Sequence, residues 1–116
     1  MGAAFTQDAD QGVKAWMVDM IAGGDKEGYE SQAQATLYFD VRDRLDKIGV
    51  PTTVNHSDHD RTVPVAAGEA LANAVPGATL HVVAGEGHYA IVQVPEKINP
   101  LLADGLGIPR DLVPRR

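Results

Sequence analysis

The sequence predicts an α/β protein built around two short strands. Residues 52–56 read as a short strand with polar positions, residues 79–84 form a short apolar run typical of a buried strand, and a helical pattern that starts at Pro64 separates them. Helical patterns also precede the first run and follow the second, where Pro95 begins a last helix. A chain of 116 residues fits one small domain, but two strands are too few for an independently stable sheet.

The first 48 residues are predicted to form helices. The first helix has an apolar stripe at helical spacing, can be capped by Asp8 or Asp10, and ends at Gly23. The stripe consists of Val13, Trp16, Met17, Met20 and Ile21. A second helix is expected to begin at Asp25, and a short third helix is expected to follow Asp40.

Polar side chains gather where each predicted strand ends. Residues 54–64 have the sequence VNHSDHDRTVP, and residues 85–88 have the sequence GEGH. The two strand ends therefore deliver a carboxylate, Asp60, and an imidazole, His88. A carboxylate beside an imidazole is the orienting half of a nucleophile–base–acid triad.

These two motifs resemble the C-terminal part of the α/β-hydrolases, and most closely the lactonases, esterases and perhydrolase-like members. The resemblance covers roughly residues 25–106 and includes Val50-Pro51-Thr52 and Pro95-Glu96 beside the two motifs. It implies that Asp60 is the catalytic acid and His88 the general base. It also implies that the two strands are adjacent and parallel, and that the N-terminal helices form a cap-like segment over the site.

The nucleophile of that family is absent from this sequence. In the family it lies in a Gly-x-Ser-x-Gly turn on an earlier strand, whereas the only serines here are Ser31 and Ser57. The resemblance therefore implies a partial α/β-hydrolase fold that carries a triad remnant. Ester or lactone hydrolysis is the implied activity, and we expect the chain to be inactive alone.

Three accounts of such a partial fold stay open. The chain can be a truncated piece of a complete hydrolase, or it can complement a separate chain that carries the nucleophile. It can also be a homodimer that completes its sheet by association and serves as a non-catalytic binding or structural module. The expected organisation is a helical cap-like segment at 1–48, the strand–helix–strand–helix part at 49–107 and a flexible tail at 108–116.

Side chains around the two motifs carry further expectations. Glu86 is expected to be exposed, and Arg61 is expected to pair with Asp58 at the surface, where such pairs contribute little. Asn55 stands in a strand that is aliphatic in the resembled family. Burial of Asn55 without partners would cost on the order of 1–3 kcal/mol, so we expect either partners for its amide or a less buried strand.

A metal site is a minor alternative. His56-x-Asp58-His59 resembles the second half of the His-x-His-x-Asp-His motif of metallo-β-lactamase-like hydrolases, and His88 would be a further ligand. The first histidine of that motif would fall at Val54, so the pattern is incomplete.

The composition excludes several classes of protein. A net charge of -6 argues against a nucleic-acid partner or an anionic membrane surface. The absence of cysteine excludes disulfides and thiol catalysis, and no apolar run approaches the ~18 residues of a membrane-spanning helix. We expect a cytoplasmic protein without a cofactor that acts on a small-molecule ester or lactone.

Overall fold

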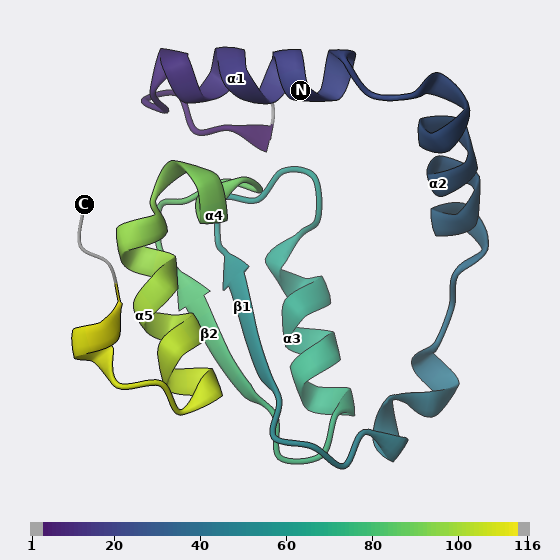
Figure 1. The fold of residues 1–116 in the computed structure, drawn as a ribbon. Helices are drawn as coiled ribbons and strands as arrows, with labels where there is room; N and C mark the ends of the chain where they lie inside the picture. The colour runs from purple at the N-terminus through teal and green to yellow at the C-terminus, as the bar shows by residue number, and fades with distance from the viewer. Residues whose placement is uncertain (1–3, 114–116) are drawn as a thin grey trace.

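The computed structural model describes residues 4–113 and contains a parallel two-stranded sheet (Figure 1). Strand β1 (Thr53–Ser57) pairs with β2 (Thr79–Val83) in a register that sets Thr53 opposite Thr79 and Ser57 opposite Val83. The adjacent parallel arrangement that the resemblance implied is thus confirmed. Because both strands run the same way, the loops that follow them leave from the same edge of the sheet.

Two helices cover the two faces of this sheet (Figure 1). Helix α3 (Val65–Ala74) lies against the face that carries His56, since a Cβ added to Gly68 would stand 2.6 Å from His56 Nδ1. Helix α5 (Pro95–Leu106) lies against the other face, since a Cβ added to Gly105 would stand 2.9 Å from Thr53 Oγ1. His56 and Thr53 are an odd number of positions apart, which places their side chains on opposite faces of β1.

Helix α1 (Gln11–Ala22) crosses above the ends of the strands (Figure 1). Asp10 caps it, because its Oδ1 accepts the Val13 N–H at 2.9 Å. Only part of the predicted stripe is covered: Met17 is buried with Phe5 and Ala9, whereas Trp16 and Met20 stay about half exposed.

Helix α2 (Lys26–Tyr38) stands apart from the sheet and buries none of its residues (Figure 1). It begins as predicted, with the Asp25 carboxylate accepting the Gly28 N–H at 2.6 Å. The short helix expected after Asp40 is the 3₁₀ helix η2 (Arg42–Lys47). Its first N–H donates to Asp40 Oδ1 at 3.1 Å.

A second apolar cluster lies between the sheet and the C-terminal helices. It consists of Val83, Ala90 and Ile98, with Val94 and Leu101 packed against it. The four-residue helix α4 (Ala90–Gln93) was not predicted. Helix α5 begins at Pro95 as predicted and continues through Pro100.

The segment predicted to be a flexible tail contains the 3₁₀ helix η3 (Arg110–Leu112), whose Arg110 pairs with Asp104 of α5. The last part of that predicted tail, residues 114–116, lies outside the described residues. Between residues 4 and 113, no helix has both the length and the apolar character needed to cross a bilayer.

Candidate active site

Asp60 and His88 are hydrogen-bonded to each other. The loop after β1 carries Asp60 and the loop after β2 carries His88, and His88 Nδ1 lies 2.8 Å from Asp60 Oδ2. The Asp60 side chain is only 7% exposed, and that of His88 is 32% exposed. The sequence prediction that these side chains lie within hydrogen-bond reach is confirmed, and their catalytic roles stay predictions.

The backbone of the first loop fixes the Asp60 carboxylate. Its Oδ1 accepts the N–H groups of Thr62 at 2.8 Å and Val63 at 2.9 Å. Burial acts to raise the pKa of Asp60, but the hydrogen bonds from Val63, His88 and Thr62 together outweigh burial and lower this pKa below its usual value. Asp60 is therefore an anion at neutral pH, aimed at the imidazole.

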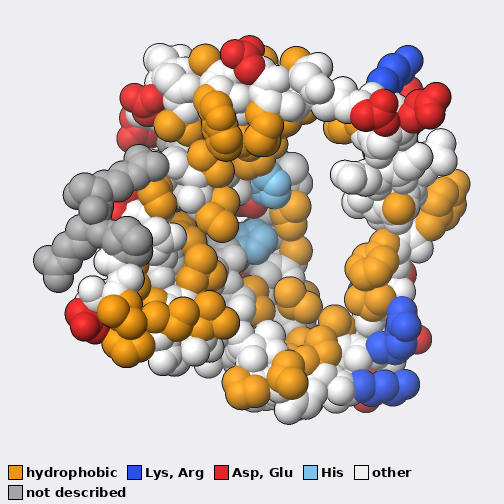
Figure 2. All heavy atoms as spheres, in the orientation of Figure 1, with side chains coloured by type: hydrophobic (Ala, Val, Ile, Leu, Met, Phe, Trp, Pro, Cys, Tyr) orange, Lys and Arg blue, Asp and Glu red, His pale blue; other side chains and the backbone are white. Residues whose placement is uncertain are grey.

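The hydrogen bond to Asp60 also sets the tautomer of His88. A carboxylate only accepts, so Nδ1 carries a proton, and in the neutral ring the lone pair is therefore on Nε2. His88, Asp60 and Ser57 line a cavity of about 400 Å³ between the strand ends and α5. In the space-filling view, histidine side chains lie in a hollow that hydrophobic side chains border (Figure 2).

Three contacts join the loop of the acid to the loop of the base. The Asp58 N–H donates to Val83 O at 3.3 Å, and the His59 N–H donates to Glu86 O at 3.1 Å. The Asp58 carboxylate accepts the Gly85 N–H at 2.7 Å. The predicted surface pair between Arg61 and Asp58 does not form within the described part of the chain, since the Asp58 carboxylate bonds to the other loop instead.

Glu86 is buried, and the expectation that it is exposed was wrong. The residue is 6% exposed because its side chain turns toward α5 and pairs with Lys97. The hydrogen bond to Glu86 raises the pKa of Lys97. The pair therefore anchors the loop that carries His88 on α5.

His56 is a second imidazole beside the same carboxylate, and the sequence had assigned it only a place in the metal alternative. Its Nε2 donates to Val63 O at 2.9 Å and lies 3.8 Å from Asp60 Oδ2. This bond braces the turn whose N–H groups hold Asp60. The signal was the small residue Gly68 on the facing helix, which leaves room for the ring.

The comparisons with known proteins point to one family. The sequence matches no protein-family model. It is 32% identical to 3-oxoadipate enol-lactonase 2 of Acinetobacter baylyi (strain ATCC 33305 / BD413 / ADP1) over 95 residues. The aligned region covers 82% of this chain and 35% of the lactonase. The esterase EaEST of Exiguobacterium antarcticum superposes with a TM-score of 0.85 at 24% identity, over 91% of this chain and 40% of that one.

A third similar protein, Est816, is described as an N-acyl homoserine lactone degrading enzyme. It is 35% identical, with a TM-score of 0.54 over 56% of this chain and 25% of that one. The chain has a partial α/β-hydrolase fold. It spans about a quarter to a third of the length of the curated relatives that it matches.

In this partial α/β-hydrolase fold the candidate acid and the candidate base are in contact, and no candidate nucleophile lies beside them among residues 4–113. No hydroxyl between residues 4 and 113 is hydrogen-bonded to His88. Ser57 is buried in the same cavity, and Ser31 is exposed on α2. Residues 4–113 therefore hold a hydrogen-bonded carboxylate–imidazole pair, and no hydroxyl is bonded to the imidazole.

The described part of the chain does not support the metal alternative, because no set of ligands lies together there. Nowhere in residues 4–113 do three His, Asp or Glu side chains group in a way that could hold a metal ion. Of the four residues proposed from sequence, the Asp58 carboxylate is used by the Gly85 N–H, and only His56 and His88 lie at Asp60.

The side-chain oxygen of Asn55 is buried without a hydrogen-bond donor among the described residues. Asn55 lines the cavity that also contains His88 and Asp60. Neither of the two expectations for Asn55 accounts for it fully: the strand is only partly buried, but the amide oxygen has lost water without gaining a donor.

Proposed function

We propose that this chain supplies the acid and the base of an ester- or lactone-hydrolysing site. Asp60 orients His88, and His88 acts as the proton-transferring group. The observation that carries the proposal is the 2.8 Å hydrogen bond between His88 Nδ1 and Asp60 Oδ2, formed across two loops at the ends of parallel strands.

In the proposed mechanism, each proton transfer passes through His88. His88 Nε2 takes the proton of a nucleophilic hydroxyl as the hydroxyl oxygen bonds to the substrate carbonyl carbon, and the ring becomes an imidazolium. The Asp60 anion stabilises that positive charge while it keeps the Nδ1–H in place. His88 then returns the proton to the departing alkoxide oxygen as the ester bond breaks.

The class of substrate comes from the relatives. An enol-lactonase, an esterase and an N-acyl homoserine lactone degrading enzyme are the activities named for three similar proteins. Their shared chemistry is attack on the carbonyl of an ester or lactone. The sequence contains no Gly-x-Ser-x-Gly motif, so the nucleophile and the oxyanion-hole N–H that follows it come from outside these 116 residues.

A chimeric enzyme tests this proposal. The part of 3-oxoadipate enol-lactonase 2 that matches this chain is replaced by this chain, so that the remaining part of the lactonase provides its own nucleophile. We expect turnover of an activated ester. Changing Asp60→Asn should lower kcat by on the order of 10⁴, because the imidazole loses its orienting anion, and His88→Ala should abolish base catalysis.

The matched control is His81→Ala, a partly buried imidazole on β2 that lies away from the cavity. This variant should keep most of the activity. A chimera that folds by circular dichroism but is inactive, or that loses no activity on His88→Ala, contradicts the proposal.

A second candidate function is a non-catalytic dimeric module. It is favoured by large apolar side chains on the surface: Trp16 is 56% exposed and Tyr38 is 87% exposed. The dimeric module requires a second copy of the chain, whereas the hydrolytic site requires a nucleophile.

A further inference from the structure

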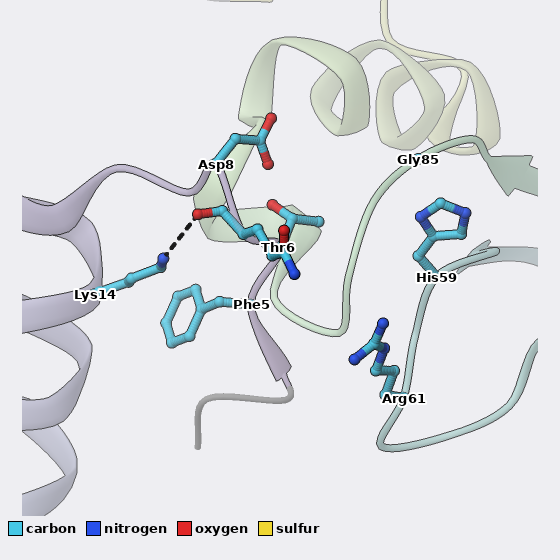
Figure 3. A pocket seen from close by; sticks show the side chains of 8 residues that line it. Phe5, Thr6, Asp8, Lys14, His59, Arg61 and Gly85 are labelled. Atoms are coloured by element: carbon cyan, nitrogen blue, oxygen red, sulfur yellow. Dashed lines mark hydrogen bonds between the residues drawn. The ribbon is translucent and has the colours of Figure 1, made fainter.

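A second cavity, of about 640 Å³, lies on the other side of the loop that carries Asp60. Its walls come from the N-terminal segment, from α1 and from both strand-end loops (Figure 3). His59 and Arg61, the two neighbours of Asp60 in the sequence, line this cavity, whereas Asp60 lines the smaller one. The proposed function makes no use of it.

Arg61 brings an unpaired positive charge to this cavity. The other arginines of the described residues, Arg42, Arg44 and Arg110, each have an acidic partner within 4 Å, and Arg61 has none between residues 4 and 113. Its nearest candidate partner in sequence, Asp58, is held by the Gly85 N–H. In a chain with a net charge of -6, a guanidinium without a carboxylate is available for an anion from outside.

Lys14 adds a second cation from the opposite wall. Figure 3 shows Lys14 projecting from α1 on one side, and Arg61 and His59 on the other. The Lys14 ammonium forms no salt bridge within the described residues and donates only a long bond, 3.5 Å, to the carbonyl oxygen of Gln7. Two unpaired cations thus face one space.

Asp8 is the one acidic residue in the lining. A hydrogen bond from the Thr6 side chain is the main cause that lowers the pKa of Asp8, so this carboxyl is ionised at neutral pH. Its charge disfavours a doubly charged ligand more strongly than a singly charged one. Phe5, whose ring is buried nearby, offers an apolar wall for a carbon chain.

We propose that this cavity binds the carboxylate of a small organic acid through Arg61 and Lys14. The planar guanidinium matches a carboxylate in a two-point contact. The inference is independent of the proposed function, because Asp60 and His88 line the other cavity and neither is among the residues that line this one.

Binding of sodium hexanoate to the intact chain, followed by NMR chemical-shift titration, tests the proposal. We expect saturable binding with a Kd on the order of 1 mM, as suits a ligand of this size. The signals that move should include the backbone amides of Thr6, Lys14 and Arg61. The neutral analogue hexanamide should bind at least tenfold more weakly, since it lacks the charge.

Two charge variants of opposite sign make the test sharp. Arg61→Gln should weaken hexanoate binding about tenfold, and Asp8→Asn should strengthen it, a gain that misfolding cannot produce. The control is Arg44→Gln, which removes an exposed arginine already paired with Asp43, and it should leave the Kd unchanged.

Three results would each overturn the proposal: equal binding of hexanamide, no change on Arg61→Gln, or tighter binding of inorganic phosphate than of hexanoate. The titration needs no turnover. Hexanoate binding combined with an inactive chimera would therefore refute the proposed hydrolysis alone, and an active chimera without hexanoate binding would refute the carboxylate site alone.

Discussion

Asp60 accepts hydrogen bonds from two backbone N–H groups and one imidazole, at distances between 2.8 and 2.9 Å. Each of these donors stabilises the charged form, and together they outweigh the burial that acts against it. The pKa of Asp60 is therefore lower in the folded chain than in the unfolded chain. This difference links the stability of the fold to pH.

The first prediction follows from the sign of that difference. A lowered folded-state pKa stabilises the fold at pH values above the unfolded pKa of about 3.9. That contribution is lost as the pH falls through the folded value. Urea unfolding at pH 7 and at pH 3 should show a smaller acid-induced loss in Asp60→Asn than in the unchanged chain.

The control for this measurement is Asp19→Asn, on the exposed side of α1. It should retain the acid-induced loss of the unchanged chain. An Asp60→Asn variant that loses as much stability between pH 7 and pH 3 as the unchanged chain would show that the hydrogen bonds of Asp60 do not stabilise the fold.

The sequence predicted the two catalytic candidates because both lie in short motifs at strand ends. It failed for Glu86, whose burial depends on Lys97, eleven positions further along on helix α5. It also assigned no structural role to His56. Local sequence contains the chemistry of a side chain, but the partner that buries or braces it is set by tertiary packing.

Among the elements, those with local start signals were the ones predicted well. Asp10 and Asp25 accept the N–H groups expected of helix caps, and both strands begin within one residue of the predicted positions. Helix α4 was missed because four residues are too few for a periodic pattern. Helix α5 runs through Pro100, and its inward residue Ile98 is buried against the sheet.

The second prediction concerns the contact between α3 and β1. A Cβ on Gly68 would lie 2.6 Å from Nδ1 and 2.8 Å from Cγ of His56. The ring cannot easily move, because it donates to Val63 O. Gly68→Ala should therefore lower the free energy of unfolding by about 1–3 kcal/mol, the usual cost of overpacking, as measured by urea denaturation.

Gly49→Ala is the matched control, because a Cβ at Gly49 meets nothing within 4 Å and Gly49 has no positive φ. It should change the stability by no more than about 0.5 kcal/mol. If Gly68→Ala is as stable as Gly49→Ala, α3 has room to shift and the close contact does not hold His56 in place.

At the scale of the whole molecule, the sheet is small and many large apolar side chains are exposed. Strand β1 pairs with β2 and with no further strand among residues 4–113. Helix α2 is exposed on all sides, and the chain that follows it exposes Phe39 by 73%. Figure 2 shows exposed hydrophobic side chains over α1 and over α2.

The sequence could predict that this sheet is incomplete, because it contains only two strand-like segments and two strands do not form an independently stable sheet. It could not predict what completes the sheet. The relatives are about three to four times as long as the part that this chain matches. Either further chain of the same kind of fold or a second copy can cover the apolar surface, and only an association measurement separates the two.

We propose, as the third prediction, that two copies associate about a two-fold axis through the exposed side of α1. The half-exposed Trp16 and Met20 supply the aromatic and flexible apolar side chains that dominate interfaces. Sedimentation should give a dimer at micromolar concentration. Dilution should shift the emission of Trp16, the only tryptophan, to longer wavelength as the interface opens.

Met20→Asp should shift the equilibrium toward monomer at least tenfold, because a buried unpaired carboxylate is costly. Leu112→Asp places the same charge on a residue that is 68% exposed on η3, away from α1, and should leave the dimer intact. A monomer at micromolar concentration, with Trp16 emission that dilution does not change, would refute the dimer.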